Sequence, residues 1–352
     1  MVTTVAVDAN GADLGPAEVA AGARLAAAEG VRVLLFGPAD LLGPSGRGVD
    51  VFDAPLSIAK ERDPVSAARR SPESSIVRAA TAVAAGDAQA LVSGGSTGAA
   101  LAAGLFQIKR APGIHRPALA VPVPVPGHPV TLLDVGANAD ARREHLVQFA
   151  YMGAAFAHAV LGVERPRVGL LSNGGEAERG SQLVLEAHEI LAERAAAGPG
   201  AFEFIGNIEG TEVLTGAADV VVTDGMTGNI ALKLIEGVSQ TVLGAVRDAA
   251  MSSGRSKLGG LLLRPALREF RASVDPERQG GAYLLGLRRL GVLPHGRFGR
   301  EGIAQAILRA RLGVEEDVVG RTHAALEAAG ALRRRSGQGV SVDSDTVGVA
   351  DD

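Results

Sequence analysis

The 352-residue chain contains no cysteine and no tryptophan, and only 3% of its residues are aromatic. The absence of cysteine excludes thiolate catalysis, disulfide bonds and cysteine-ligated metal sites. A net charge of −4 gives no reason to expect nucleic acid as a partner. We see no signal peptide, and no apolar run reaches the roughly 18 residues of a membrane-spanning helix, so we expect a cytoplasmic protein.

Glycine and small aliphatic residues are abundant instead, and they recur in a pattern of strand, glycine turn and helix. The fullest example runs from Ala218 to Gly237. Val220 to Val222 predict a buried parallel strand, and the turn at Asp224-Gly225 leads into a helix that we expect to begin near Thr227. A helix N-terminus beside glycines offers N–H groups to an anion. We therefore expect phosphate to bind at this turn.

A second turn of this kind follows the strand that we expect over Ala90 to Ser93. Its glycines enclose Ser96 and Thr97, and the helix follows from Ala99. Such a turn can present N–H and hydroxyl groups to a phosphate or a developing oxyanion. The alternative is a tight packing contact without a ligand. The glycines match neither the dinucleotide fingerprint nor a P-loop, so we expect no nucleotide cofactor and disfavour a dehydrogenase.

Polar residues gather after two other strands and in one further loop. Asp8 ends the first predicted strand, and Asp134, Asn138 and Asp140 follow a later one. The later group allows a metal site or a set of hydrogen-bond fixtures; with two carboxylates and no third acid, we predict fixtures and no metal. His295 precedes the C-terminal helix and is either a structural hydrogen-bonding residue or part of a site.

Strands and helices alternate along the chain from its first strand, Val5–Asp8. The βαβ spacing predicts an α/β fold, a three-layer α/β/α doubly wound arrangement around a mostly parallel sheet. We expect residues 1–330 to form a single two-lobed unit. Residues 331–352 are polar and rich in glycine and serine, which predicts a disordered tail.

Three segments depart from this alternation. We expect residues 38–62 to be irregular, and residues 121–126 to be an edge strand or a loop because of their prolines. Between Arg255 and Arg271, leucines interleave with basic residues, and Pro265 predicts two short helices with a bend. A basic amphipathic segment suits the headgroup region of a membrane. The alternative is an apolar face packed in a dimer interface or against the core.

The turn before the long helix carries a specific resemblance. Asp224-Gly225-Met226-Thr227-Gly228-Asn229, with Leu232-Lys233 and Glu236-Gly237, resembles the D-G-F-T-G-N-x-x-L-K-x-x-E-G signature of the bacterial phosphate acyltransferase family, PlsX. Residues 134–140 resemble its D-V-G-A-N-x-D motif, and similar motifs appear in the same order over residues 4–315. The resemblance implies a fold akin to phosphotransacetylases and isocitrate dehydrogenase.

The resemblance also implies a reaction and partners. Inorganic phosphate would attack the thioester of a long-chain acyl-acyl-carrier-protein, releasing acyl carrier protein and giving acyl-phosphate for phospholipid (phosphatidic acid) synthesis. It further implies a homodimer in peripheral contact with the inner membrane surface. The downstream glycerol-3-phosphate acyltransferase is a possible further partner.

The residues fit this chemistry, which requires a held phosphate and a stabilised thioester oxygen. We expect Lys233, Asn229 and the backbone of Thr227 and Gly228 to bind phosphate. Asp224 and Asn138 would orient these groups, and the Ser93–Gly98 turn would face the acyl carbonyl. Direct attack by phosphate is our hypothesis, and an acyl-enzyme on Ser93 or Ser96 is the alternative. The remaining candidates for substrate binding are Asp8, Gly95, Ser96, Thr97, Gly98, Gly225 and His295.

The chain departs from the family pattern within or beside its glycine loops. The departures are Asn10, Ala12, Gly94, Ser96, Ser172 and Arg297. They leave open a paralogue that uses acyl-coenzyme A or a specialised carrier-bound acyl group. A second alternative is a non-catalytic scaffold that binds membrane or carrier protein, against which the retained Asp224, Asn229 and Lys233 argue. If Ala12 required a positive φ, the first loop would also have to differ from the family's.

Overall fold

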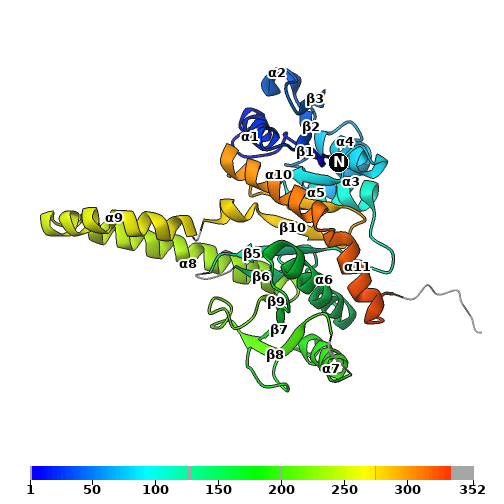
Figure 1. Cartoon of the computed structure of the whole chain (residues 1–352), viewed down its shortest axis with the longest axis vertical. Coiled ribbons are helices and arrows are strands. Elements are labelled where there is room, and N and C mark those ends of the chain that lie inside the picture. The colour runs from blue at the N-terminus through cyan, green and yellow to red at the C-terminus, as the bar shows by residue number, and fades with distance from the viewer. Residues whose placement is uncertain (1, 126–128, 198–199, 274, 334–352) are drawn as a thin grey trace, which may run out of the picture.

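One mixed sheet forms the centre of the protein (Figure 1). The computed structural model describes residues 2–125, 129–197, 200–273 and 275–333. Within these ranges 11 strands follow the order β3-β2-β1-β4-β11-β10-β5-β6-β9-β7-β8. The strands are β1 (Thr4–Asp8), β2 (Arg32–Gly37), β3 (Val49–Asp53), β4 (Ala90–Ser93), β5 (Ala118–Val123), β6 (Val130–Leu133), β7 (Arg167–Ser172), β8 (Glu203–Glu209), β9 (Val220–Val222), β10 (Ala282–Leu285) and β11 (Leu290–Leu293).

Helices cover both faces of this sheet. They are α1 (Pro16–Ala28), α2 (Ala39–Leu42), α3 (Pro64–Arg70), α4 (Ser75–Ala85), α5 (Thr97–Ala103) with the π-helical turn η1 (Gly104–Ile108), α6 (Arg143–Leu161), α7 (Gln182–Ala196), α8 (Gly225–Met251), α9 (Gly254–Ser273), the 3₁₀ turn η2 (Pro276–Gln279), α10 (Arg300–Glu315) and α11 (Val318–Ala328). Val5 and Val7 pack into a core with α1, α6, α7 and α10, whereas Ala6 faces α3, α4 and α5. The three-layer α/β/α prediction is thereby confirmed.

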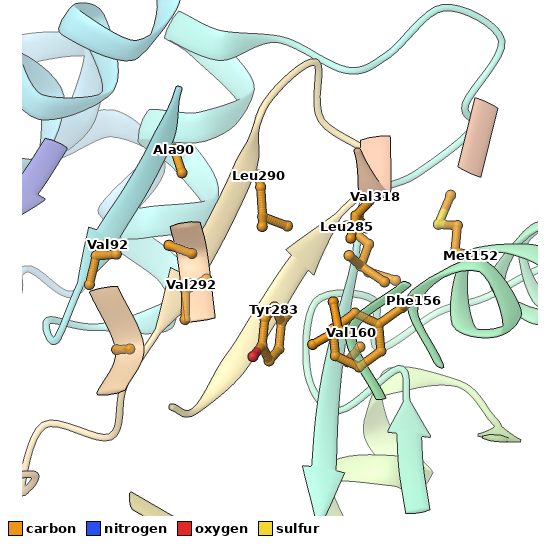
Figure 2. Close-up of a cluster of buried hydrophobic side chains, with 14 of the residues drawn as sticks. Ala90, Val92, Met152, Phe156, Val160, Tyr283, Leu285, Leu290, Val292 and Val318 are labelled. Carbon is orange, nitrogen blue, oxygen red and sulfur yellow. The ribbon is translucent and has the colours of Figure 1, made fainter. Parts of the chain in front are cut away.

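Strand direction reverses in the middle of the sheet. Seven strand pairs are parallel, but β11 with β10, β10 with β5 and β5 with β6 are antiparallel. The parallel strands on the β1 side therefore run opposite to those on the β9 side. Figure 2 shows the core at this junction, where the Tyr283 ring of β10 lies 4.5 Å from the Phe156 ring of α6.

The central position of β5 corrects one prediction. Residues 121–123 are part of a strand between β10 and β6, neither an edge strand nor a loop. Pro122 has no N–H to donate, but β10 pairs only with Ala118 to Ala120. Among the described residues, the end of β5 that carries Pro122 therefore has no strand partner on that side. Residues 126–128 lie outside the described ranges.

Two further predictions were also wrong. Strand pairing decided the structure in one case, and solvent exposure decided it in the other. Residues 38–62 are not uniformly irregular, since they contain α2 and the edge strand β3. Pro265 lies inside the single helix α9 instead of separating two helices. Proline lacks the N–H group that would donate a hydrogen bond to the carbonyl of Leu261. Because α9 is exposed there, water can donate to this carbonyl instead. Of the predicted tail, residues 334–352 lie outside the described ranges.

Helices α8 and α9 form an arm that projects from the body (Figure 1). Only Gly225 and Gly228 of the 27 residues of α8 are buried. Beyond them, α8 and α9 expose many large apolar side chains, including Leu234 and Leu262. None of the helices in the described ranges is both long and apolar enough to cross a membrane.

Candidate active site

The start of α8 is locked against the turn that follows β6. The Asp224 carboxylate accepts hydrogen bonds from the N–H groups of Met226 and Thr227, at 3.0 and 2.9 Å, and from the Thr227 hydroxyl at 2.6 Å. The Gly225 N–H donates to the Asn138 carbonyl at 2.8 Å, and the Gly228 N–H donates to the Asp224 carbonyl. All four N–H groups from Gly225 to Gly228 therefore have protein acceptors. We had expected the backbone of Thr227 and Gly228 to bind phosphate, but these N–H groups are not free to do so.

The turn after β6 is held by a buried carboxylate. Asp134 accepts from the N–H groups of Leu119, Ala137 and Asn138, and from the Asn138 side-chain amide at 2.9 Å. The same amide also donates to the Pro117 carbonyl at 2.8 Å. Burial raises the pKa of the Asp134 carboxyl, against the effect of these hydrogen bonds. Asn138 thus fixes the turn, and the NH₂ group of its side chain donates to two acceptors.

Close backbone contact requires glycine at the first turn of α8. A Cβ on Gly228 would lie 2.0 Å from the Asp134 carbonyl oxygen. A Cβ on Gly225 would lie 2.7 Å from the Asn138 carbonyl oxygen. Both obstacles include backbone atoms that cannot swing aside, which explains the spacing of the two glycines.

The turn before α5 is built on a second buried carboxylate. Asp8, at the end of β1, accepts from the Ser93 hydroxyl at 2.7 Å and from the Asn10 N–H, and Ser93 in turn accepts from the Gly95 N–H. Burial raises the pKa of the Asp8 carboxyl. Ser96 caps α5 by accepting from the Ala99 N–H. Among the described residues, no acceptor pairs with the N–H groups of Thr97 and Gly98.

Two departures from the family pattern meet in this turn. A Cβ on Gly94 would lie 3.3 Å from the Cβ of Ala12. In the family motifs that these segments resemble, glycine stands at position 12 and alanine at position 94. This chain therefore also has one methyl group at the contact, on residue 12 instead of residue 94. Ala12 is not among the described residues with positive φ, so alanine there causes no backbone strain.

A cleft of about 330 Å³ joins the two turns. One wall is Gly95 to Thr97 and the other is the first half of α8. The strands β5, β10 and β11 supply an apolar floor, and the loop from β11 to α10 closes one end. The lining side chains outside the predicted set are Leu119, Val121, Val135, Leu232, Glu236, Ala282, Leu293, Pro294, Arg297 and Phe298.

Opposite charges face each other in this cleft. The Lys233 ammonium lies 2.9 Å from the Glu236 carboxylate. Partial desolvation and the positive charge of Arg297 lower the pKa of His295, whose side chain is exposed. The cleft thus combines a lysine, an arginine, a histidine and one carboxylate above an apolar floor.

The structure separates the predicted site residues into two groups. Asn229, Lys233 and His295 line the cleft, as do Gly95, Ser96 and Thr97. The other predicted residues do not line the cleft but belong to the hydrogen bonds and close contacts of the two turns that form its walls. They are Asp8, Ser93, Gly98, Asn138, Asp224, Gly225, Thr227 and Gly228. Glu236 was missed, although its place three residues after Lys233 puts both on one helix face.

Two other observations concern alternative sites. A wider groove of about 720 Å³ lies over β2, β3 and α4, but neither glycine turn contributes to it. In the described ranges no three His, Asp or Glu side chains gather closely enough to hold a metal ion, and Asp140 points into solvent.

The chain shares its α/β fold with solved phosphotransacetylases. The phosphotransacetylase of Streptococcus pyogenes matches with a TM-score of 0.60 at 17% identity, over 89% of this chain and 94% of the other. The EutD phosphotransacetylase of Staphylococcus aureus matches with a TM-score of 0.58 at 20% identity, over 88% and 94%. Likeness at such identity defines the fold alone.

Sequence comparison defines the family. The model described as fatty acid synthesis protein matches residues 3–321. The phosphate acyltransferase of Levilactobacillus brevis is 43% identical over 313 residues, which are 86% of this chain and 89% of the relative. The chain therefore belongs to the phosphate acyltransferase (PlsX) family, as its signature predicted, and it is an acyltransferase of fatty acid synthesis.

Proposed function

We propose that the protein transfers a long-chain acyl group from acyl carrier protein to inorganic phosphate, for phospholipid synthesis. The observation that carries this proposal is the cleft, where the helix face that bears Asn229 and Lys233 lies across an apolar floor from a turn whose Thr97 and Gly98 N–H groups have no acceptor among the described residues. An acyl thioester needs both an anionic nucleophile held in place and a donor for its carbonyl oxygen.

Phosphate binds in this proposal to side chains on α8. Asn229 and Lys233 are four residues apart, so they lie on one face of the helix, and both line the cleft. The N–H groups at the start of α8 already donate to Asp224 and Asn138. The side chains of Asn229 and Lys233 therefore make the phosphate contacts. Asp224 and Asn138 orient the helix without touching the substrate.

The thioester carbonyl lies in this proposal against the turn before α5. The Thr97 N–H has no acceptor among the described residues and belongs to a residue that lines the cleft. As the oxygen becomes negative, this N–H stabilises it without any rearrangement of the protein. Ser93 is buried and bonded to Asp8, so direct attack by phosphate is favoured over an acyl-enzyme on Ser93.

The experiment is phosphate-dependent release of carrier-protein thiol from palmitoyl-acyl-carrier-protein, with the acyl-phosphate trapped by hydroxylamine. Turnover supports the proposal. Turnover of acyl-coenzyme A alone supports the paralogue instead, and silence with both substrates supports the scaffold. Labelled acyl chain retained on Ser93 or Ser96 after a quench without phosphate would contradict direct attack.

We also propose that the arm mediates assembly. An apolar row along α8 at every fourth residue is 44–63% exposed, which suits a second copy of the chain. The row is Ile230, Leu234, Val238, Val242 and Val246. Sedimentation should show a dimer, and Val238→Glu should yield monomers.

The basic leucine-rich face of α9 suits peripheral contact with a membrane surface. Leu261 and Leu262 are exposed beside basic Arg264 and Arg268. Cosedimentation with anionic vesicles, lost in a Leu261→Asp, Leu262→Asp variant, tests this contact. Such a location would bring the product near a downstream glycerol-3-phosphate acyltransferase.

A further inference from the structure

The cleft contains one carboxylate at the place where an anion must bind. Glu236 is about 29% exposed and lines the cleft, and its Oε2 lies 2.9 Å from the Lys233 ammonium. Its charge also acts on His295 across the cleft. A carboxylate repels an anion that binds to the same lysine, so its presence in the proposed phosphate site needs a chemical reason.

The geometry lets one anion contact Lys233 and Glu236 together. An ammonium that donates to a carboxylate and to an anion at ordinary hydrogen-bond lengths holds the two acceptors about 4.6 Å apart. The oxygens of a tetrahedral anion extend in four directions, so a second oxygen of the same anion comes within reach of Glu236. No described residue donates a hydrogen bond to Glu236 Oε1.

We propose that Glu236 is the residue that makes the cleft select phosphate over sulfate; this inference rests on the proposed phosphate site. Near neutral pH inorganic phosphate keeps at least one proton, which an ionised carboxylate can accept in a hydrogen bond. Sulfate has the shape of phosphate and the same charge as its singly protonated form, but it has no proton to donate. Against Glu236 it leaves two acceptors facing each other, which sites built around a hydroxyl donor reject strongly.

The test is binding of inorganic phosphate and of sulfate, each alone, to the full-length protein by calorimetry without acyl substrate. The wild type should prefer phosphate by about a hundredfold or more. In Glu236→Gln, which keeps the size of the side chain and an oxygen for Lys233, that ratio should fall about tenfold or more, because the amide can donate to sulfate. Glu315→Gln, at the far end of α10 in an exposed ion pair with Arg311, should keep the wild-type ratio.

The ratio separates selectivity from structural damage, because a distorted cleft weakens both anions together. An unchanged ratio in Glu236→Gln, equal affinities in the wild type, or no binding of either anion overturns the inference. Sulfate inhibition of turnover provides a second readout and should strengthen in Glu236→Gln. If phosphate binds selectively but no thiol is released from any acyl substrate, the proposed reaction fails while the role of Glu236 stands.

Discussion

The two glycine turns of the cleft have the same plan but offer different groups to a substrate. Each follows a strand and opens a helix, and each is held by a buried carboxylate, Asp8 or Asp134. At the start of α8 the N–H groups donate to acceptors within the protein, and the side chain that lines the cleft is Lys233. At α5 the N–H groups of Thr97 and Gly98 lack acceptors in the described structure. The same local motif can thus either pair its own N–H groups and present a lysine side chain, or leave N–H groups without acceptors.

The largest expected effect tests the rigidity of the α8 turn. Gly228→Ala places a Cβ 2.0 Å from the Asp134 carbonyl oxygen, whereas Gly98→Ala meets only the Pro64 ring at 2.9 Å. We expect Gly228→Ala to lower the free energy of unfolding by about 3 kcal/mol or more, and Gly98→Ala by about 1–2 kcal/mol. Urea unfolding measures both. Equal costs would show that the two turns are equally yielding.

The donor role of the α5 turn is tested by Thr97→Pro. Thr97 is the first residue of α5, a position where proline is tolerated, and Ser96 before it is extended. The substitution removes one N–H, and we expect kcat to fall about a hundredfold with little change in the KM for phosphate. Thr97→Ala keeps the N–H and serves as the control. A change in the KM for phosphate alone would place phosphate, and not the thioester, at this turn.

The cationic role of α8 is tested by Lys233→Ala. We expect the KM for phosphate to rise about tenfold or more while the KM for the acyl substrate stays within about twofold, because a charged hydrogen bond to the anion is lost. Lys257→Ala on the outer arm is the matched control. Steady-state kinetics at varied phosphate checks this, and unchanged phosphate dependence would refute the assignment of Lys233.

A smaller effect concerns Asp134, the buried carboxylate that holds the turn against which α8 begins. Burial raises the pKa of Asp134 in the folded protein. Below pH of about 4 the carboxyl is neutral whether folded or unfolded, and as pH rises through the folded pKa its contribution to stability is lost. Relative to Asp134→Asn, the free energy of unfolding of the wild type should therefore decline, by at most about 1.4 kcal/mol per pH unit. Urea titrations at several pH values test this, with the exposed Asp140→Asn as control.

The smallest effect concerns Gly94. Gly94→Ala should cost less than about 1 kcal/mol, because its methyl group meets Ala12 at 3.3 Å and the neighbours can shift slightly. Adding Ala12→Gly should restore the lost part of the free energy of unfolding. A double-mutant cycle by urea unfolding measures the coupling, and additive effects would show that the two positions do not sense each other.

Local spacing was enough to predict that two polar side chains of α8 lie on one helix face. Asn229 and Lys233 stand four residues apart after a strand and a glycine turn, and both line the cleft. The same spacing carried the signal for Glu236, which we read only as part of a signature. The floor of the cleft could not be predicted in this way, because Val121 belongs to a strand whose central place depends on pairing with distant segments.

Local sequence also could not predict whether the N–H groups at the start of α8 have acceptors within the protein. The Gly225 N–H finds its acceptor at Asn138, 87 positions earlier in the chain. Sequence identified the helix start and the glycines but could not show that a remote loop would take that donor. At α5 the acceptors are local, so Ser96 as a cap was within reach of the pattern.

The contact between Ala12 and Gly94 restricts the order in which this turn can be rebuilt. Between the family pattern, glycine then alanine, and the pattern of this chain there are two single-step routes. One passes through glycine at both positions and meets no obstacle, while the other places two methyl groups 3.3 Å apart. An engineer grafting the family turn onto this protein should therefore change Ala12 first and Gly94 second, and a library that samples the positions one at a time would undervalue alanine at position 94.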